Sequence, residues 1–579
     1  MRYPTIRELN TSREMIDIFK GYNHNLRIGN GEFYEMTNLS SDHYPILSQR
    51  TQRGVYASPD IPQGMVAKDA LCYIDGGDFV INEYHIPMGL TVDDKPKALI
   101  SMGAYVIIMP DKKYINTENY EDKGSIEASV KTTSKVKFSL CKVDGEEYGE
   151  IPSQAKPPDK PANMALWIDT SSTPHTLKQY SETTSAWSAI ATTYVRISCT
   201  GIGKPFSEGD GVTISGVEDK TLADLNTSTV IMAKGDNYIV VRGILEKVIE
   251  QESAIKIERK MPNMDFIIES GNRLWGCHYG VALNGEIVNE IYASKLGDFK
   301  NWSCYQGIST DSYAAGVGTD GQFMGAITHL GYPVFFKENY MHKVYGNYPA
   351  NYQIQTTPCR GVQKDCHRSL AIVNETLYYK SRSGVCAYDG SLPAEVSAAL
   401  GDAVYSNAVA GAVGNKYYIS MQDTDGGWHL FVYDTVKGMW HREDDTQADD
   451  FCACRGDLYF INHATEQIQT VKGTGLKEDT PIKWSCTTGI FGTDSPDKKY
   501  ISRLDVRMKI NVGTRVTFFV EYDSSGEYQH LFTMTGKNLQ SFSVPIRTRR
   551  CDHLRLRIIG AGEAKIFSIC KTIEWGSNL

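Results

Sequence analysis

A short phrase of strand, tight turn and strand returns along this chain, and no other feature constrains the fold so strongly. Clear copies occupy residues 265–275, 369–379 and 408–419. Each begins with an apolar run, turns at Gly-Asn or Asn-Glu, and continues into a strand that contains Tyr or Trp. A self-similar unit of roughly 40 residues made only of short strands is typical of a β-propeller blade. The sequence therefore predicts an all-β fold built on an irregular β-propeller of six or seven blades.

Size and composition agree with this interpretation. The chain has 579 residues, and since one compact core usually takes roughly 150 residues, several units are expected. Its 34 Tyr and 51 Gly suit many strands joined by tight turns.

The net charge of −9 argues against a protein whose whole surface grips nucleic acid, because phosphate binding requires clustered Lys and Arg. A bore through which DNA only slides tolerates a neutral or acidic wall. The thirteen cysteines are scattered and show no zinc-type pair of CxxC motifs, which favours reduced thiols and cytoplasmic folding. No segment resembles a signal peptide or a membrane span, so we expect a soluble chain that is not exported by a classical route.

The domain organisation follows from where the repeated phrase starts, stops and resumes. Residues 1–60 are predicted to form an extended docking arm with one short helix over 11–19, ended by Gly21. The first blades are expected over 61–129 and the remaining blades over 259–473.

Two further modules are predicted outside the blades. The repeated strand–turn–strand phrase is absent from residues 130–258, which contain Pro-rich and Ser/Thr-rich stretches and a few predicted strands. This segment is predicted to be a small β domain inserted in a propeller loop. Residues 480–579 contain long strands with alternating apolar positions, which predict a C-terminal β-sandwich that caps propeller edges.

Several aspartates and tryptophans mark turns between blade strands. The turn at 294–302 resembles the aspartate-box turn of sialidase-type propellers, in which a carboxylate and an aromatic residue hold a hairpin. The spacing departs from the full motif, so the predicted role is structural. The predicted structural residues of the blade turns are Asp298, Trp302, Asp389, Asp434 and Trp440.

No motif predicts a metal ion, a cofactor or a catalytic centre. The acidic turns at 423–427 and 494–497 lack the ligand alternation and terminal Glu of a calcium loop. The neighbours Cys366-His367, and His441 with Glu443 and Asp444, are interpreted as structural. No GxSxG motif, no P-loop and no strand-linked GxGxxG that opens a helix is present, and we expect no enzyme. A carboxylate pair drawn from different blades stays open, as does sugar binding by surface aromatics.

Short phrases near the N-terminus resemble the opening of one protein family. They are Gly-Tyr-Asn at 21–23, Gly-Glu at 31–32, Met-Thr-Asn-Leu at 36–39 and Tyr-Pro-Ile-Leu-Ser-Gln-Arg at 44–50, followed by the blade phrases at 289–294 and 297–302. Together they resemble the phage tail-nozzle and head-completion proteins, which stabilise packaged DNA and in which a wrapped arm precedes an irregular propeller.

The resemblance implies a structural virion protein of a phage tail. Its copies, six by expectation, would form a ring below the portal and adaptor that continues the DNA channel and helps to retain and release the genome. Arg50 and Arg53 of the arm are the candidate docking residues. Portal, adaptor and distal tail proteins would be its partners, with double-stranded DNA passing through the bore. The protein would be made in the host bacterial cytoplasm and end in the virion.

Two other functions remain open at this stage. A receptor-binding or baseplate protein would present an aromatic patch that recognises host glycan. A propeller glycosidase would cleave host polysaccharide with a pair of carboxylates.

Overall fold

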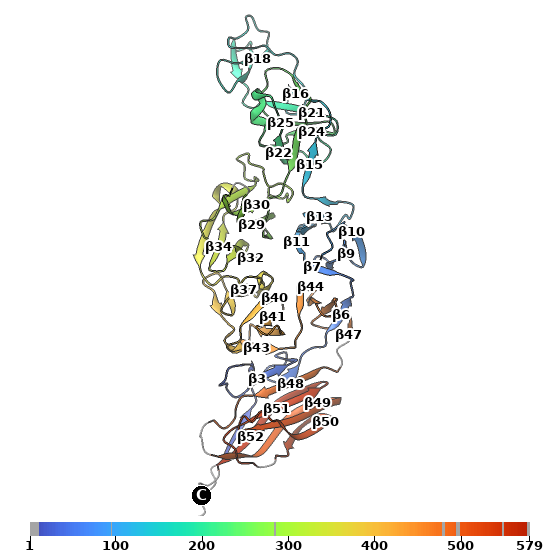
Figure 1. Cartoon of the computed structure of the whole chain (residues 1–579), viewed down its shortest axis with the longest axis vertical. Coiled ribbons are helices and arrows are strands. Elements are labelled where there is room, and N and C mark those ends of the chain that lie inside the picture. Colours follow the sequence, from blue (N-terminus) through green and yellow to red (C-terminus); the bar gives the residue numbers. More distant parts are fainter. Residues whose placement is uncertain are drawn as a thin grey trace, which may run out of the picture. The chain divides into compact units, whose positions relative to one another are not determined.

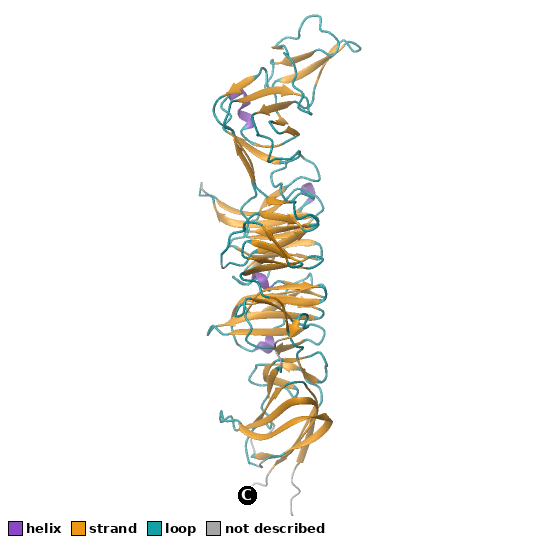
Figure 2. Cartoon of the chain, turned by 90° about the vertical axis from the view of Figure 1, so that its right-hand side faces the viewer, coloured by secondary structure: helices purple, strands orange, loops and turns teal. Residues whose placement is uncertain are grey.

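The computed structural model describes residues 11–93, 95–282, 285–477, 481–493, 498–546 and 549–575, and almost all regular structure in these ranges is β-strand (Figures 1 and 2). The described helices are four short 3₁₀ turns: η1 (Lys220–Leu225), η2 (Pro349–Asn351), η3 (His367–Ser369) and η4 (Ala398–Leu400). Two compact units are present. Unit 1 comprises residues 1–99, 335–341 and 356–579, and unit 2 comprises 100–334 and 342–355. The all-β prediction is confirmed.

Seven antiparallel sets of four strands, six of them consecutive in sequence, have the form of propeller blades, which confirms the propeller-type architecture. The first copy of the repeated phrase shows why the strands pair: Gly271 and Asn272 both take positive φ, as a tight hairpin turn requires. Six of the seven sets are β7 (Pro62–Ala67), β8 (Leu71–Asp75), β9 (Asp78–Ile81), β10 (Tyr84–Pro87); β11 (Ala98–Met102), β12 (Tyr105–Met109), β13 (Lys113–Asn116), β14 (Lys123–Ser125); β28 (Phe266–Ser270), β29 (Arg273–Val281), β30 (Ile287–Ala293), β31 (Tyr313–Gly316); β32 (Phe323–His329), β33 (Tyr332–Lys337), β34 (Tyr340–Tyr345), β35 (Gln353–Pro358); β36 (Ala371–Val373), β37 (Thr376–Lys380), β38 (Val385–Tyr388), β39 (Ala394–Glu395); and β40 (Tyr405–Val413), β41 (Lys416–Asp423), β42 (Trp428–Asp434), β43 (Met439–Arg442).

The seventh blade combines distant parts of the sequence. Strands β44 (Ala448–Cys454), β45 (Asp457–Asn462) and β46 (Gln467–Thr470) are completed by β6 (Gly54–Ala57), which also pairs with β47 (Leu476–Lys477). Within unit 1 this blade packs on β7–β9 through a shared apolar core that includes Met65, Tyr73 and Ile461. The strand from the N-terminal arm thus closes a blade whose other strands lie about 400 residues later.

The arm forms strands, and the predicted helix over 11–19 is wrong. Residues Thr11–Ile16 form β1, which pairs antiparallel with β52 (Ala564–Trp575). Burial alternates along β1, with Met15 63% exposed and Ile16 buried, and a helix of this length is marginal on its own. The edge of β52 supplies the backbone partners that decide between the two conformations. The other arm strands are β2 (Gly21–Tyr22), β3 (Glu32–Thr37), β4 (Leu39–Ser40) and β5 (Leu47–Gln49).

The C-terminal strands show the expected one-sided burial and belong to one large hydrogen-bonded sheet. The long strand β49 pairs with β52 over its first half and with β51 over its second half, changing partner at residues 511–514. Its other edge pairs with β50. The remaining strands of this module are β48 (Lys483–Thr488), β49 (Lys499–Tyr522), β50 (Gln529–Val544) and β51 (Leu554–Ala561).

The inserted domain lies between β14 and β28 in unit 2, with strands from 128 to 259 where the sequence predicts 130–258. It contains three sheets around its own apolar core, which includes Phe138, Ile197 and Ile239. Its strands are β15 (Ala128–Lys131), β16 (Val136–Cys141), β17 (Ser153–Gln154), β18 (Leu166–Asp169), β19 (Thr176–Ser181), β20 (Ala186–Ala189), β21 (Tyr194–Ser198), β22 (Gly211–Ser215), β23 (Ser228–Val230), β24 (Ala233–Gly235), β25 (Tyr238–Arg242), β26 (Ile249–Gln251) and β27 (Lys256–Arg259).

We predict that residues 126–261 fold when expressed alone, because the core and the buried Asp210–Arg259 ion pair lie inside this segment. The fragment should give a β-type circular dichroism spectrum and a cooperative thermal transition. Phe138→Ala should lower its unfolding free energy by about 3–5 kcal/mol, since the ring is fully buried. A random-coil spectrum of the unaltered fragment would show that the domain depends on the blades.

Candidate functional site

The N-terminal arm joins a propeller blade to the C-terminal module through backbone hydrogen bonds. Strand β2 pairs with β43 at Tyr22 and Trp440, and it runs parallel to β3. Strand β3 in turn pairs with β48. The approach is close at Gly21, where φ is +82° and a Cβ atom would lie 2.3 Å from the carbonyl oxygen of Trp440. One sheet of unit 1 therefore runs from the blade β40–β43 through the arm into β48 and β51.

A cluster of four charged side chains, three of them buried and one partly buried, reinforces this joint. Arg53 contacts Glu443 at 2.7 Å and Asp444 at 3.0 Å, and Arg50 lies 3.7 Å from each carboxylate. Arg50 also donates to Asn38 Oδ1 at 2.7 Å. Burial by itself would raise the pKa of Asp444, but Arg53, the Thr446 hydroxyl and Arg50 outweigh it and lower that pKa to about 2. The cluster holds the arm against the loop that follows β43.

The docking role expected of Arg50 and Arg53 is corrected by this arrangement. The two residues are only 7% and 8% exposed, and their guanidinium groups are engaged by carboxylates of the same chain. A side chain buried in an internal ion pair offers no surface to another protein. Both arginines are internal connections of unit 1.

The blade turn at 294–302 has the predicted structural role, and it also anchors the inserted domain within unit 2. Asn301 donates to Asp298 at 2.6 Å and to Asp210 at 3.0 Å, and its own amide oxygen accepts from the backbone of Gly211. The buried indole of Trp302 donates to the carbonyl of Phe299 at 3.0 Å. Sequence reasoning found the turn and missed Asn301, whose partners lie about 90 residues earlier.

The other predicted turn residues also have structural contacts. The carboxylate of Asp389 accepts from the backbone and hydroxyl of Ser391, as in an Asx turn. Asp434 accepts from Val436 and Lys437 and from the arm residue Ser41, whose hydroxyl lies at 2.6 Å. Trp440 is buried and its indole N–H donates to the carbonyl of Val396 at 2.8 Å.

The remaining suggestive residues fit the structural interpretation. Asp423 accepts from Asp425, Gly427 and His429 within its turn, and the hydrogen bond from His429 lowers the pKa of its carboxyl. His441 is buried, and burial together with Lys416 lowers its pKa to about 3. The turn at 494–497 lies outside the described residues.

The described parts of the chain contain neither a metal-binding cluster nor a membrane-spanning helix. There, no group of three or more His, Cys, Asp or Glu side chains is placed to hold a metal ion. Over the same ranges, no helix has both the length and the apolar character needed to cross a membrane.

The C-terminal module carries a cationic excess that the whole-chain charge conceals. Residues 481–579 contain 15 Lys and Arg and 9 Asp and Glu, a balance of +6, so the rest of the chain carries −15. On β49 the buried positions alternate with exposed ones, and the outward positions are occupied by Arg503, Arg507, Lys509 and Arg515. Lys509 lies directly opposite Lys565 of β52, a pairing of like charges that costs stability. A charge count by segment would have revealed this face.

A pocket of about 460 Å³ opens in unit 1 where the first strands of three blades approach one another. Each strand has a β-bulge there: β7 between Pro62 and Met65, β40 between Ser406 and Val409, and β44 between Ala448 and Asp450. Two of the bulges, those of β44 and β7, are tied together, since the Asp450 carboxylate accepts from the backbone N–H of Met65 at 2.9 Å. A bulge changes the direction in which the side chains of a strand point. Bulges are therefore common beside binding sites.

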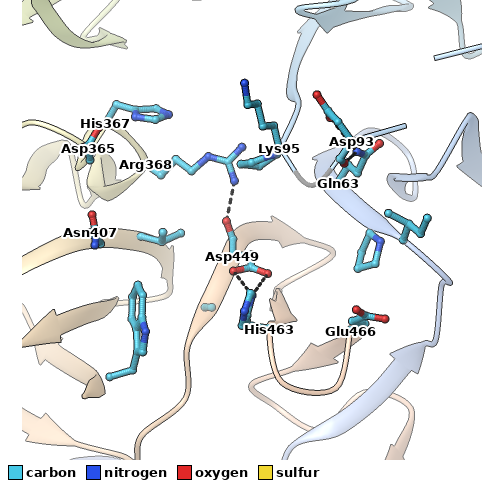
Figure 3. Close-up of a pocket in the computed structure, with 16 residues that line it drawn as sticks. Gln63, Asp93, Lys95, Asp365, His367, Arg368, Asn407, Asp449, His463 and Glu466 are labelled. Carbon is cyan, nitrogen blue, oxygen red and sulfur yellow. Dashed lines mark hydrogen bonds and ion pairs between the residues drawn. The ribbon is translucent and has the colours of Figure 1, made fainter. Parts of the chain in front are cut away.

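Polar and charged side chains from several elements line this pocket alongside apolar ones (Figure 3). Arg368 donates to the carbonyl of Asp449 at 2.6 Å, and the Asp449 carboxylate contacts His463 at 2.9 Å. Gln63 is 3% exposed and its Oε1 atom has no hydrogen-bond partner among the described residues. The full lining is Ile61, Pro62, Gln63, Asp93, Lys95, Pro96, Asp365, His367, Arg368, Asn407, Val409, Trp428, Ala448, Asp449, His463 and Glu466.

Comparisons with known proteins leave the family open. No family model matches the sequence, and no curated protein matches it. Among solved structures, the chain is similar to an exo-β-1,3-galactanase from Phanerochaete chrysosporium (TM-score 0.21, 11% identity, 53% of this chain and 94% of that chain). It is also similar to the phage phi92 endosialidase (TM-score 0.23, 9% identity, 75% and 68%) and a Trypanosoma rangeli sialidase (TM-score 0.17, 8% identity, 90% and 95%). At these TM-scores none of the three carries an argument about this chain.

We predict that Arg53→Met lowers the unfolding free energy of unit 1 by about 3–5 kcal/mol, because the buried Glu443 and the partly buried Asp444 then lose their closest cation. Denaturant unfolding followed by tryptophan fluorescence measures this, with Trp440 of the same blade as a probe. The exposed pair Lys142–Glu146 supplies the control, and Lys142→Met should change nothing measurable.

The same cluster predicts a pH dependence. Because the pKa of Asp444 in the folded chain is about 2, below its ordinary value of 3.8, its stabilising contribution is complete above about pH 4 and is lost as the pH falls towards 2. In Arg53→Met the loss should begin at higher pH. An Arg53→Met protein with the stability and acid profile of the unaltered chain would contradict the role given to the cluster.

Proposed function

We propose that the chain is a structural subunit of a bacteriophage tail. Its copies form a ring below the portal and adaptor that continues the DNA channel and helps to retain and release the genome. The observation that carries the proposal is the sheet of unit 1 in which the arm strands β2 and β3 connect the blade β40–β43 to the C-terminal module.

This sheet suits a structural part because it couples two modules without a flexible linker. Backbone hydrogen bonds between strands are directional and numerous, so a blade and a module that share a sheet cannot rotate freely against one another. Part of the arm phrases that resemble the tail-nozzle family lies in this joint: Tyr22 of β2 and Met36 of β3 are buried, as are Leu39 and Leu47 of the following arm strands. The N-terminal part of the resemblance therefore includes residues that hold the joint together.

The cationic face of β49 and β52 supports a role beside DNA. Exposed Arg507, Lys509 and Arg515 are spaced along one face, and Lys565 lies next to Lys509. Such a row attracts the phosphate backbone without reading sequence. The acidic remainder of the chain disfavours tight binding elsewhere, which agrees with DNA that must pass through and not remain bound.

The other parts have roles that follow from this proposal. The blade loops define the bore, and the inserted domain and C-terminal module contact neighbouring copies, the portal and adaptor, or distal tail proteins. The protein acts without catalysis, is made in the bacterial cytoplasm and resides in the virion.

Negative-stain electron microscopy of the purified full chain, alone and mixed with the products of neighbouring genes, tests the assembly. We expect rings with a central bore and a fixed rotational symmetry, six-fold by our expectation. Isolated particles in every mixture, or hydrolysis of host polysaccharide by the purified protein, would contradict the proposal.

A charge-reversal experiment tests the DNA contact. We predict that the full chain binds duplex DNA weakly, and that Lys509→Glu with Lys565→Glu reduces the slope of log K against log salt by about 2, one contact for each lysine. The matched control is Lys220→Glu with Lys247→Glu on exposed positions of the inserted domain. Equal slopes for both double variants would remove the C-terminal face from the DNA path.

A further inference from the structure

We infer that the pocket of unit 1 between the first strands of three blades binds a saccharide that carries no acidic group, either neutral or an amino sugar. This inference is independent of the proposed structural role. It rests on how the pocket is built, on an unsatisfied group in its wall, and on the chemistry of its lining.

The pocket is built by coordinated departures from regular strand structure. Bulges in β7, β40 and β44 occur at the same place, although β7 lies more than 300 residues before the consecutive blades that begin with β40 and β44. Asn407, with a φ of +48°, sits in the bulge of β40, and Gln63 sits in the bulge of β7. A bulge interrupts the backbone hydrogen bonds between two strands and so costs stability. Three bulges at one place therefore indicate a feature that is kept for its function.

An unsatisfied group in the wall points to a ligand. Gln63 is almost completely buried, and its side-chain N–H₂ donates to Asp93, while its Oε1 has no partner in the described structure. A buried acceptor without a hydrogen bond costs free energy. A hydroxyl or amino group of a bound molecule would satisfy it.

The lining selects the class of molecule. Four carboxylates, from Asp93, Asp365, Asp449 and Glu466, face two cations, from Lys95 and Arg368, so the pocket repels acidic ligands. The carboxylates of Asp365 and Glu466 make no hydrogen bond or ion pair with any described residue, and their oxygens can accept from hydroxyl groups.

The pocket also has an aromatic side chain on which a sugar ring can stack. Trp428 lines the pocket together with Val409 and Ala448, and an indole face suits the apolar face of a sugar ring. The cavity has room for one or two sugar rings. The lining contains no Ser, Thr or Cys, so its described groups favour binding over nucleophilic attack by a side-chain hydroxyl or thiol.

Saturation-transfer NMR and calorimetric titration of the full chain test the inference. The probes are glucose, galactose, N-acetylglucosamine, glucosamine and their β-linked disaccharides, with sialyllactose and inorganic phosphate as anionic probes. We expect at least one neutral or amino sugar to bind with a Kd on the order of 1 mM or tighter. Binding only of the anionic probes, or of none, would overturn the inference.

Variants locate the binding. Trp428→Ala should weaken binding about tenfold or more, whereas Tyr84→Ala, at a 68% exposed position outside the pocket, should leave it unchanged. Glu466→Gln and Asn407→Gly change exposed residues, and glycine keeps the positive φ at 407, so both proteins should fold and bind more weakly. Unchanged affinity in both would place the sugar elsewhere and overturn the assignment. Rings with no sugar binding would leave the proposed function intact and remove this inference alone.

Discussion

The pairing of the N-terminal arm with β43 and β48 is the interaction on which the rest of unit 1 depends. It turns a propeller blade and a C-terminal module into one sheet, and it places β6 where it completes the blade of β44–β46. The hydrogen bonds alone would hold two strands of only two and six residues. The charges of Arg50, Arg53, Glu443 and Asp444 add specificity, since burying any of them without its partners is strongly unfavourable. The arm can therefore dock in one register only.

The same blades that give rigidity also produce the pocket. Regular strands alternate their side chains between two faces, so side chains from three neighbouring strands converge only where the ladders are interrupted. The Asp450 carboxylate, whose pKa is raised by burial, ties the bulge of β44 to that of β7 and keeps the interruption in place. Arg368 of η3 connects two other segments, because its guanidinium group donates to the carbonyl of Asp449 in β44 and to the carbonyl of Lys97 just before β11. The pocket is thus a fixed part of the fold.

Sequence reasoning succeeded where structure is decided locally and failed where it is decided by distant partners. The hairpin phrases, the turn at Asp298 and Trp302, and the inserted domain all follow from short-range patterns. The segment 11–16 has no such local signal: the edge of β52 makes it a strand, and that edge lies more than 550 residues away. Arg53 could not be recognised as buried, because Glu443 and Asp444 follow it by about 390 residues. The pocket was hidden for the same reason, since bulges in β7, β40 and β44 have no composition of their own.

The charged face of the C-terminal module was missed for a different reason. Its excess of Lys and Arg is visible in the sequence, but the net charge of the whole chain conceals it. The net charge of −9 for the whole chain describes neither the C-terminal module, whose net charge is +6, nor the rest of the chain, whose net charge is −15. Beyond about 8–10 Å charges are screened at physiological salt, so a polyanion near β49 responds to the local row of Arg and Lys and not to the total. The acidic remainder disfavours contact with a polyanion along its length. Segregated charge of this kind favours salt-sensitive contact between a polyanion and one face of the chain, and the proposed role beside DNA uses this property.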